Sequence, residues 1–189
     1  MGTARLLIIA GSLAALTTLS AQAVTSNGTI AATLILTNGC LINGSPSQNG
    51  INFGTLDFGT HPATFSTLTT QLSGASGGNS FTVQCTTSSY TVVIAGNTNS
   101  TPPTSVVGTP GTPPRFLVST SNATQGVAYV LASDSNFNNI ITNNTALPIA
   151  SSTNGIDSYT LFGRIQGGGN SVSVVPGTYT DTINVTVNY

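Results

Sequence analysis

One pentapeptide has the spacing of a catalytic serine turn. Residues 74–78 read GASGG, which matches the pattern G-x-S-x-G around Ser76. In hydrolases that motif follows a strand and precedes a helix, and an acid and then a histidine come later in the chain. Here strand-forming residues follow the motif, and the single histidine, His61, precedes the serine. General acid-base catalysis also requires titratable groups held close together. We therefore expect a turn at Ser76 and no catalytic residue, with a secreted hydrolase as a weaker alternative.

A second run begins like a calcium-binding loop. Asp134 opens the sequence DSNFN, but Asn139 and Thr145 stand where such a loop needs Gly and a bidentate Glu. A turn is the favoured interpretation, and a weak ion site is the alternative. His61, beside Pro62, has no second ligand type nearby, so we expect no metal site and no cofactor.

The chain contains two cysteines, Cys40 and Cys85. In an exported protein an even number of cysteines indicates a disulfide, whereas a catalytic or metal-binding pair would need closer spacing or further ligands. A bridge between them would close a long loop, for which the loop-entropy model gives roughly 4 kcal/mol of stabilisation. We expect a structural disulfide between Cys40 and Cys85.

Charged residues are scarce. The 189 residues include three Lys or Arg and four Asp or Glu, and hydrophobic residues make up 39%. Nucleic-acid binding requires Lys and Arg to neutralise phosphates, so nucleic acid is excluded as a partner. The normal hydrophobic fraction argues against disorder. We expect Arg115 and Arg164 to pair with Asp181 or Asp157 and so fix loops, in preference to binding a ligand.

The first residues have the pattern of a cleaved secretory signal. Arg5 precedes an uncharged run from Leu6 to about Leu19, and the small residues Ala21 and Ala23 flank Gln22. The run is short for a bilayer span, and the small residues suit a signal peptidase. We predict a signal peptide over residues 1–23, and no membrane span in the mature chain.

The remaining sequence predicts an all-β fold. Short segments rich in β-forming residues are separated by Gly, Asn and Pro, which is typical of a sandwich or barrel. The expected strands cover residues 29–37, 51–58, 66–72, 80–86, 90–95, 115–118, 126–132, 159–165 and 178–189. Residues 97–114 hold five of the nine prolines and are expected to form a loop, as are residues 166–170.

Apolar and polar residues alternate strictly at both ends of the mature chain. In residues 29–37 (TIAATLILT) four apolar side chains share one face of an extended chain, and the C-terminal strand alternates in the same way. The N-terminal set is Ile30, Ala32, Leu34 and Leu36; the C-terminal set is Ile183, Val185, Val187 and Tyr189. Two exposed edge strands are an aggregation hazard unless something pairs with them. The N-terminal strand can complete its own sheet or be lent to another molecule, and we favour the second.

A series of short motifs runs through nearly all of the mature chain. They are Gly39-Cys40, Asn52-Phe53-Gly54, Phe58-Gly59, Cys85, Arg115, Tyr129-x-Leu131 with Asp134, LFGRI at residues 161–165, and PGTYTDT at residues 176–182 before a terminal aromatic residue. In these motifs and in their order the chain resembles the spore coat protein U domain family, which includes the subunits of archaic, Csu-type chaperone-usher pili.

The resemblance implies an incomplete immunoglobulin-like β-sandwich that is completed by donor-strand complementation. In that family a periplasmic chaperone first fills a groove left by a missing strand, and the N-terminal strand of the next subunit then replaces it. Carried over here, residues 24–37 are the donor strand with Ile30, Ala32, Leu34 and Leu36 inserted, and residues 38–189 are one domain. The groove would lie beside the C-terminal strand, with Tyr189 at the chaperone contact. Ala32 is small, which predicts one shallow groove position.

The resemblance further implies a structural role. The protein would be a pilus subunit, most like a major stalk pilin, exported through the periplasm to the cell surface. Its partners would be identical or homologous subunits in a homopolymer, the chaperone and an outer-membrane usher, and the fibre would support adhesion and biofilm formation. The rival hypothesis is a self-contained secreted adhesin or coat-type binding module, which would fold residues 29–37 into its own sheet.

Overall fold

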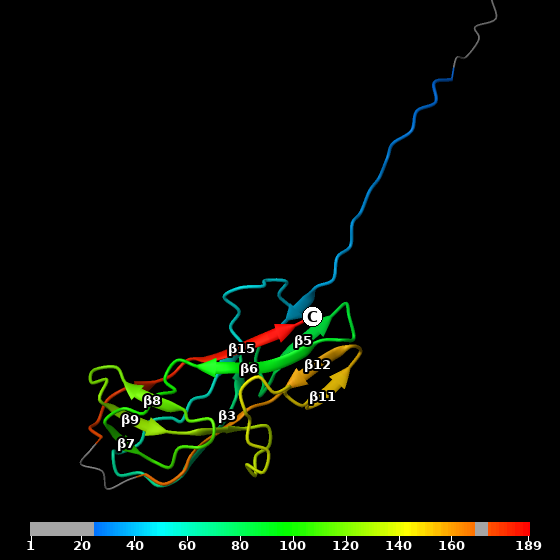
Figure 1. Cartoon of the computed structure of the whole chain (residues 1–189). Coiled ribbons are helices and arrows are strands. Elements are labelled where there is room, and N and C mark those ends of the chain that lie inside the picture. The colour runs from blue at the N-terminus through cyan, green and yellow to red at the C-terminus, as the bar shows by residue number, and fades with distance from the viewer. Residues whose placement is uncertain (1–24, 169–173) are drawn as a thin grey trace, which may run out of the picture. The chain divides into compact units, whose positions relative to one another are not determined.

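The computed structural model describes residues 25–168 and 174–189, so the predicted signal peptide and part of the loop at residues 166–170 lie outside the described residues. The chain divides into two units, Met1–Ile35 and Leu36–Tyr189. The described part of the first unit, residues 25–35, contains no strand, and its side chains are exposed. The second unit contains all the strands (Figure 1).

Fifteen short strands form the second unit, and the described residues contain no helix. One sheet has the order β1 (Cys40–Ile42), β5 (Phe81–Cys85), β12 (Ile156–Tyr159) and β11 (Ser151–Thr153). A second has the order β10 (Val130–Ala132), β13 (Phe162–Ile165) and β3 (Leu68–Gln71). A third has the order β14 (Tyr179–Thr180), β8 (Phe116–Ser119), β9 (Gln125–Ala128) and β7 (Ser105–Val107). Two pairs complete the unit: β15 (Ile183–Asn188) with β6 (Thr91–Asn97), and β2 (Gly54–Thr55) with β4 (Ser73–Gly74).

A single hydrophobic core joins these sheets. Phe81 is fully buried, with its ring edge-on to Phe53 at 5.0 Å and stacked on Tyr159 at 5.3 Å between centroids. The same cluster includes Ile94 of β6 and side chains from β1, β9 and β13. Several sheets contribute to this one core. Because the described residues form strands and no helix, the predicted all-β class is confirmed.

One predicted strand is reduced to two residues in the structure, and three others are divided. The segment at residues 51–58 contributes two strand residues, Gly54 and Thr55, and Gly54 adopts a positive φ of 133°. The segment at 126–132 divides at Tyr129, whose N–H donates to the Arg115 carbonyl. The segment at 159–165 divides after Tyr159, and that at 178–189 divides at Asp181. At each division the chain leaves one sheet and enters another, which a local pattern does not reveal.

The strand predicted at residues 29–37 does not form in the single chain. Residues 25–39 carry no secondary structure. An extended segment gains strand structure only through hydrogen bonds to a neighbour.

The proline-rich loop predicted at residues 97–114 contains one short strand, β7, at the edge of its sheet. The prolines lie before and after this strand, so they remove no hydrogen bond from its pairing.

Truncating a side chain at the centre of this core should destabilise the domain. We expect Phe81→Ala to lower the free energy of unfolding by about 3–5 kcal/mol, because it removes buried ring contacts and leaves a cavity. Urea unfolding of the purified protein measures the change. Ile149→Ala, at a side chain that is 52% exposed, is the control and should change stability by less than about 0.5 kcal/mol. Equal effects of the two substitutions would contradict this description of the core.

Candidate functional site: a groove beside the C-terminal strand

The C-terminal strand β15 has one apolar face and one polar face. Ile183, Val185 and Val187 are half-buried against the core, and the intervening residues are exposed. The strand pairs antiparallel with β6 (Figure 1). The register runs from Ile183 opposite Asn97 to Asn188 opposite Thr91, with a bulge between residues 184 and 185. Alternating side chains on a strand with a paired neighbour hold the apolar face toward the core.

Among the described residues, no strand lies along the second edge of β15. In the part of the chain that the structure describes, β15 pairs with β6 alone. Strand β1 also lies at the edge of its sheet, pairing with β5 on one side. Backbone N–H and C=O groups along such an edge can receive another strand.

Three hollows in series form a groove that begins between these two edges and continues past the start of β15. The first hollow, about 540 Å³, is lined by Cys40 and Ile42 of β1 and by β15 up to Tyr189. The middle hollow, about 370 Å³, shares Ile51, Phe53, Ile183 and Val185 with the first. The third, about 510 Å³, shares Leu56, Phe58 and Leu117 with the middle one and extends to His61 and Tyr179. Because neighbouring hollows share lining residues, they form one continuous groove, called here the C-terminal groove.

The floor of the C-terminal groove is an uncovered part of the hydrophobic core. Ile51, Phe53, Leu56, Phe58 and Leu117 are half-buried side chains that pack against fully buried ones. Each leaves part of its apolar surface open toward the groove. Contiguous exposed apolar surface rimmed by polar residues marks a binding site for another chain or ligand.

Glycines allow the segment at residues 51–58 to form one wall. Gly54 has φ of 133°, and a Cβ there would lie 2.3 Å from the Ser73 carbonyl oxygen. The Gly54 N–H donates to Asn52 Oδ1 at 2.9 Å, which fixes the turn. Farther on, the Phe58 ring lies over Gly163 of β13, where a Cβ would stand 2.9 Å from the ring. The Asn52-Phe53-Gly54 and Phe58-Gly59 motifs therefore hold Phe53 and Phe58 at the groove.

A polar cluster anchors β15 at the middle of the groove. The Asp181 carboxylate accepts hydrogen bonds from Asn97 Nδ2 at 2.7 Å and Tyr129 OH at 2.8 Å. It also accepts from the backbone N–H groups of Asn99 at 3.0 Å and Thr182 at 2.8 Å. Four donors to one carboxylate connect the start of β15 to the end of β6 and to the core.

Arg115 joins this cluster through amides. Its guanidinium is buried and donates to Asn97 Oδ1 at 3.2 Å and to Asn143 Oδ1 at 2.6 Å. The predicted pairing with Asp181 is therefore indirect, because Asn97 lies between the two groups. Burial lowers the pKa of Arg115 below its usual value. Burial raises the pKa of Tyr129, and the Asp181 carboxylate raises that pKa further, so Tyr129 remains a neutral donor. Sequence reasoning missed Asn97 and Asn143, which carry no motif.

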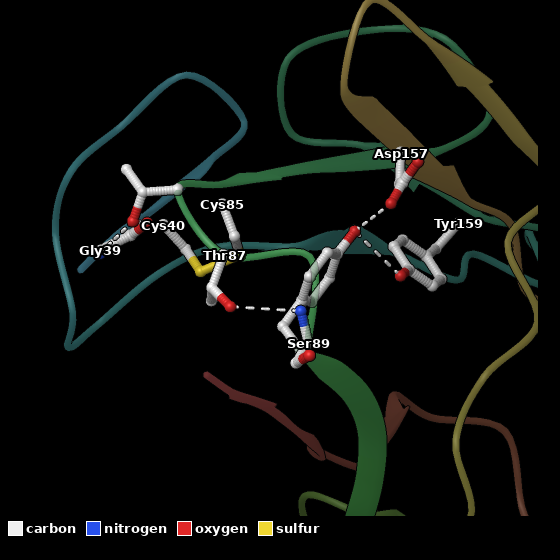
Figure 2. The surroundings of a disulfide bond; sticks show 9 residues. Gly39, Cys40, Cys85, Thr87, Ser89, Asp157 and Tyr159 are labelled. Carbon is white, nitrogen blue, oxygen red and sulfur yellow. Dashed lines mark hydrogen bonds between the residues drawn. A yellow bond between two sulfur atoms is a disulfide. The ribbon is translucent and has the colours of Figure 1, made fainter.

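The disulfide lies at the wall of the first hollow. Cys40 and Cys85 are bonded, as predicted, and they face each other in the register of β1 and β5 (Figure 2). Cys40 also lines the first hollow. Because β1 has three residues, few hydrogen bonds hold it, and the covalent link fixes it to β5. The disulfide therefore stabilises one side of the C-terminal groove.

Asp157 and Tyr159 belong to the surroundings of the disulfide (Figure 2). Tyr90 OH donates to the Asp157 carboxylate, and Tyr159 OH donates to Tyr90 OH at 3.3 Å. Hydrogen bonds from Ser152 and Tyr90 lower the pKa of Asp157. Burial and the Asp157 hydrogen bond raise the pKa of Tyr90. The cluster joins β12 to the start of β6.

The predicted donor residues lie in the segment without secondary structure. Ile30 is 98% exposed, and Leu34 and Leu36 are 80% and 83% exposed. Three large aliphatic side chains on one face of an unpaired segment are unusual for a folded protein. Their role as a donor strand, with Ala32, stays a prediction.

The other motifs form ordinary turns. Residues 74–78 begin at the last residue of β4 and lead toward β5. Within them the Gly77 N–H donates to the Gly74 carbonyl, and Ser76 Oγ donates to the Asn43 carbonyl at 3.4 Å. The Asp134 carboxylate accepts backbone N–H groups of Asn136, Asn138 and Asn139, which lowers the pKa of Asp134. His61 Nε2 lies 2.7 Å from the Phe58 carbonyl oxygen. Among residues 25–168 and 174–189 no three His, Cys, Asp or Glu side chains gather as a metal site.

Arg164 takes part in a different contact from the predicted one. Its guanidinium carbon lies 4.4 Å from the centre of the Phe137 ring, and Nη2 donates to Gln166 Oε1 at 3.3 Å. A cation over an aromatic face is favourable by about 0.5–1 kcal/mol at partly exposed sites. The contact connects β13 to the turn at Asp134.

Fold and groove together define a class: an all-β domain whose core lies open along its C-terminal strand. The chain belongs to the Spore Coat Protein U domain family, whose model matches residues 26–186, and the resemblance drawn from the motifs is thereby confirmed. In a search of curated proteins, no sequence matches the chain. A search for helices able to cross a membrane finds none in the described residues.

One similar solved structure is the CsuC-CsuE chaperone-tip adhesion subunit pre-assembly complex from archaic chaperone-usher Csu pili of Acinetobacter baumannii. The TM-score is 0.44 at 18% sequence identity. The match covers 82% of this chain and 40% of the other, so the present chain spans less than half the length of that one.

Removing the charge at the anchor of β15 should destabilise the domain. We expect Asp181→Asn to lower the free energy of unfolding by about 2–3 kcal/mol, because one carboxylate oxygen becomes an amide that faces buried donors. Chemical denaturation measures the loss. Asp57→Asn removes an exposed carboxylate that accepts from Gly59 and is the control, with a change of less than about 0.5 kcal/mol. If Asp181→Asn were equally harmless, the polar cluster would not anchor β15.

Alkaline pH should destabilise the folded protein. Burial raises the pKa of Tyr90, Tyr129, Tyr159 and Tyr179 above 10.0, so these phenols stay neutral in the fold while the unfolded chain ionises them. Stability is then complete below about pH 10 and falls as the pH rises further. Absorbance of tyrosinate should increase together with the loss of folded structure in a pH titration. Gradual ionisation of these tyrosines in a protein that stays folded would contradict the assignment.

Proposed function

We propose that the protein is a structural subunit of an extracellular chaperone-usher pilus. The observation that carries the proposal is the open core along β15, a strand with one paired edge, in a chain that also holds an exposed alternating apolar segment. Residues 30–36 of one subunit would enter the C-terminal groove of a second and pair with β15. The family assignment supports this role.

Burial of the donor side chains and new backbone hydrogen bonds would favour insertion of the segment into a second subunit. Burying Ile30, Leu34 and Leu36 is worth roughly 1.5–3 kcal/mol each, about 5–9 kcal/mol before ordering costs. Backbone hydrogen bonds to the free edge add about 0.5–1.5 kcal/mol each. The donor surface and the acceptor surface of one subunit differ, so the contact is heterologous and continues into a filament. This chemistry fits a homopolymer of stalk subunits, and it assigns no catalytic step.

The open groove also accounts for the other proposed partners. A subunit that reaches the periplasm with its core exposed needs a temporary occupant, and a chaperone strand on β15 would supply one. Tyr189 lies at the end of the first hollow and is 47% exposed, which suits a contact with that chaperone. An outer-membrane usher would then exchange the chaperone for the next subunit and release the fibre at the cell surface, where it would support adhesion and biofilm formation.

The test is a pair of charge substitutions on opposite faces of the donor segment. We expect the full chain, expressed with its secretion partners, to give a ladder of multimers in SDS without heating. Leu34→Asp should abolish the ladder, because it places a charge in an apolar groove. Thr33→Asp places the same charge on the opposite face and should leave the ladder largely intact.

Two other outcomes would contradict the proposal. Monomers from the unsubstituted chain, folded without any chaperone, would favour the self-contained binding module. A ladder that survives Leu34→Asp would mean that the subunits join through another surface.

A further inference from the structure

Five Asn-Gly dipeptides occur in the chain, at residues 27–28, 38–39, 43–44, 49–50 and 154–155. Asparagine is among the residues that decay chemically in proteins. The backbone nitrogen that follows it can attack the side-chain amide carbon, and glycine at that next position has no Cβ to block the approach. Reaction within one chain is fast only when the two atoms can meet in the right geometry. The structure around each pair therefore determines whether its asparagine is stable.

Hydrogen bonds fix the side chain of Asn43. Its Nδ2 donates to the Asn52 carbonyl, and its Oδ1 accepts from the Thr82 N–H, each at 3.0 Å. The Asn43 N–H also donates to the Thr82 carbonyl at 2.9 Å. Because the side chain and the backbone are both held, the amide carbon cannot turn toward the Gly44 nitrogen unless these bonds break.

At residues 38–39 the attacking nitrogen itself is engaged. The Gly39 N–H donates to Thr86 Oγ1 at 2.9 Å, and the Gly39 carbonyl accepts from the Thr86 N–H at 2.9 Å. The pair at residues 154–155 is the turn between β11 and β12, and the pairing of these two strands restrains it. Folding therefore limits the motion of both pairs.

No such restraint acts on the pair at residues 49–50. Both residues are exposed, and among the described residues neither the Asn49 side chain nor the Gly50 N–H has a hydrogen-bond partner. The loop that carries this pair lines the first hollow of the C-terminal groove. The pair at residues 27–28 is likewise exposed and lies in the segment without secondary structure. Asn49 is therefore the unrestrained asparagine of an Asn-Gly pair within the folded unit.

We propose that Asn49 is a site of spontaneous deamidation, which places a carboxylate at the rim of the first hollow as the protein ages. The Gly50 nitrogen forms a bond to Asn49 Cγ, the Cγ–Nδ2 bond breaks, and Nδ2 leaves as ammonia with the proton from the Gly50 nitrogen. Water then opens the resulting succinimide ring at either carbonyl carbon, its hydroxyl going to that carbon and a proton to the nitrogen. The products are aspartate and isoaspartate, and isoaspartate lengthens the main chain by one atom before Ile51.

The added charge is large for this chain. With three Lys or Arg and four Asp or Glu, one new carboxylate changes the formal net charge from −1 to −2. The carboxylate would lie next to the segment that contains Ile51, which lines both the first and the middle hollow. A charge beside an apolar surface makes the burial of that surface less favourable. The inference concerns the folded chain alone and does not depend on the proposed function.

Peptide mapping by mass spectrometry tests the proposal on the purified protein, incubated at neutral pH either folded or unfolded in urea. Chymotrypsin is the suitable protease, because the chain has no lysine and few arginines. In the unfolded chain the five pairs should deamidate at rates within about threefold of one another, because each has the same two residues. In the folded protein Asn49 and Asn27 should keep their unfolded rates within about threefold, whereas Asn38 and Asn43 should slow by about tenfold or more.

Asn43 is the internal control, because glycine follows it as it follows Asn49 while hydrogen bonds hold its side chain. If Asn49 slows on folding as much as Asn43 does, Asn49 is not reactive in the native protein and the proposal is overturned. If Asn43 and Asn38 react in the folded protein as fast as Asn49, the fold does not select the site, and the proposal is again overturned.

Two threonine substitutions test how the fold protects Asn38. Thr86→Val removes the hydroxyl that accepts from the Gly39 N–H and should speed deamidation of Asn38 by about fivefold or more. Thr87→Val removes a hydroxyl that accepts from the Ser89 N–H and should leave that rate within about twofold. An unchanged rate at Asn38 in the Thr86→Val protein would overturn the protective role of this hydrogen bond.

Discussion

The unsatisfied edge of β15 is the constraint on which the rest of the structure depends. A strand with one paired edge leaves backbone donors and acceptors facing outward, and here apolar core side chains lie open beside them. A protein that exposed both to solvent permanently would be prone to aggregation. Such an edge is tolerable when a defined strand covers it, and this is why the groove and the exposed segment at residues 30–36 are best understood together.

Several structural features position the walls of the groove. The Cys40–Cys85 bridge fixes the three-residue β1 on one side. The Asp181 cluster fixes the start of β15 on the other side, and Arg115 reaches it through the Asn97 amide. Gly54 lets the wall at residues 51–58 turn where a side chain would collide with Ser73. Each of these features acts on a wall of the groove, where a partner strand would be received.

Local patterns predicted much of this and missed what depends on distant contacts. The alternation of apolar and polar residues predicted the strand at residues 183–188, because that pattern lies within neighbouring residues. The disulfide was predicted because the chain has two cysteines. The divisions at Tyr129 and Asp181 were missed because they occur where the chain changes sheets. Asn97 and Asn143 were missed because an amide becomes significant only when folding brings a buried Arg to it. The resemblance implied a groove beside the C-terminal strand, but the side chains that line it follow from the sheet topology and could not be read from a local pattern.

Segment-resolved hydrogen exchange tests the central claim most directly, comparing purified fibres with the chaperone-bound subunit. The account predicts that amides of residues 30–36 exchange rapidly in the chaperone-bound subunit and are protected at least a hundredfold in the fibre, because they pair with β15 of a neighbour. Amides of residues 25–28 lie outside the paired segment and should exchange rapidly in both. Equally rapid exchange of residues 30–36 in fibre and subunit would contradict the account, because no donated strand could then occupy the groove.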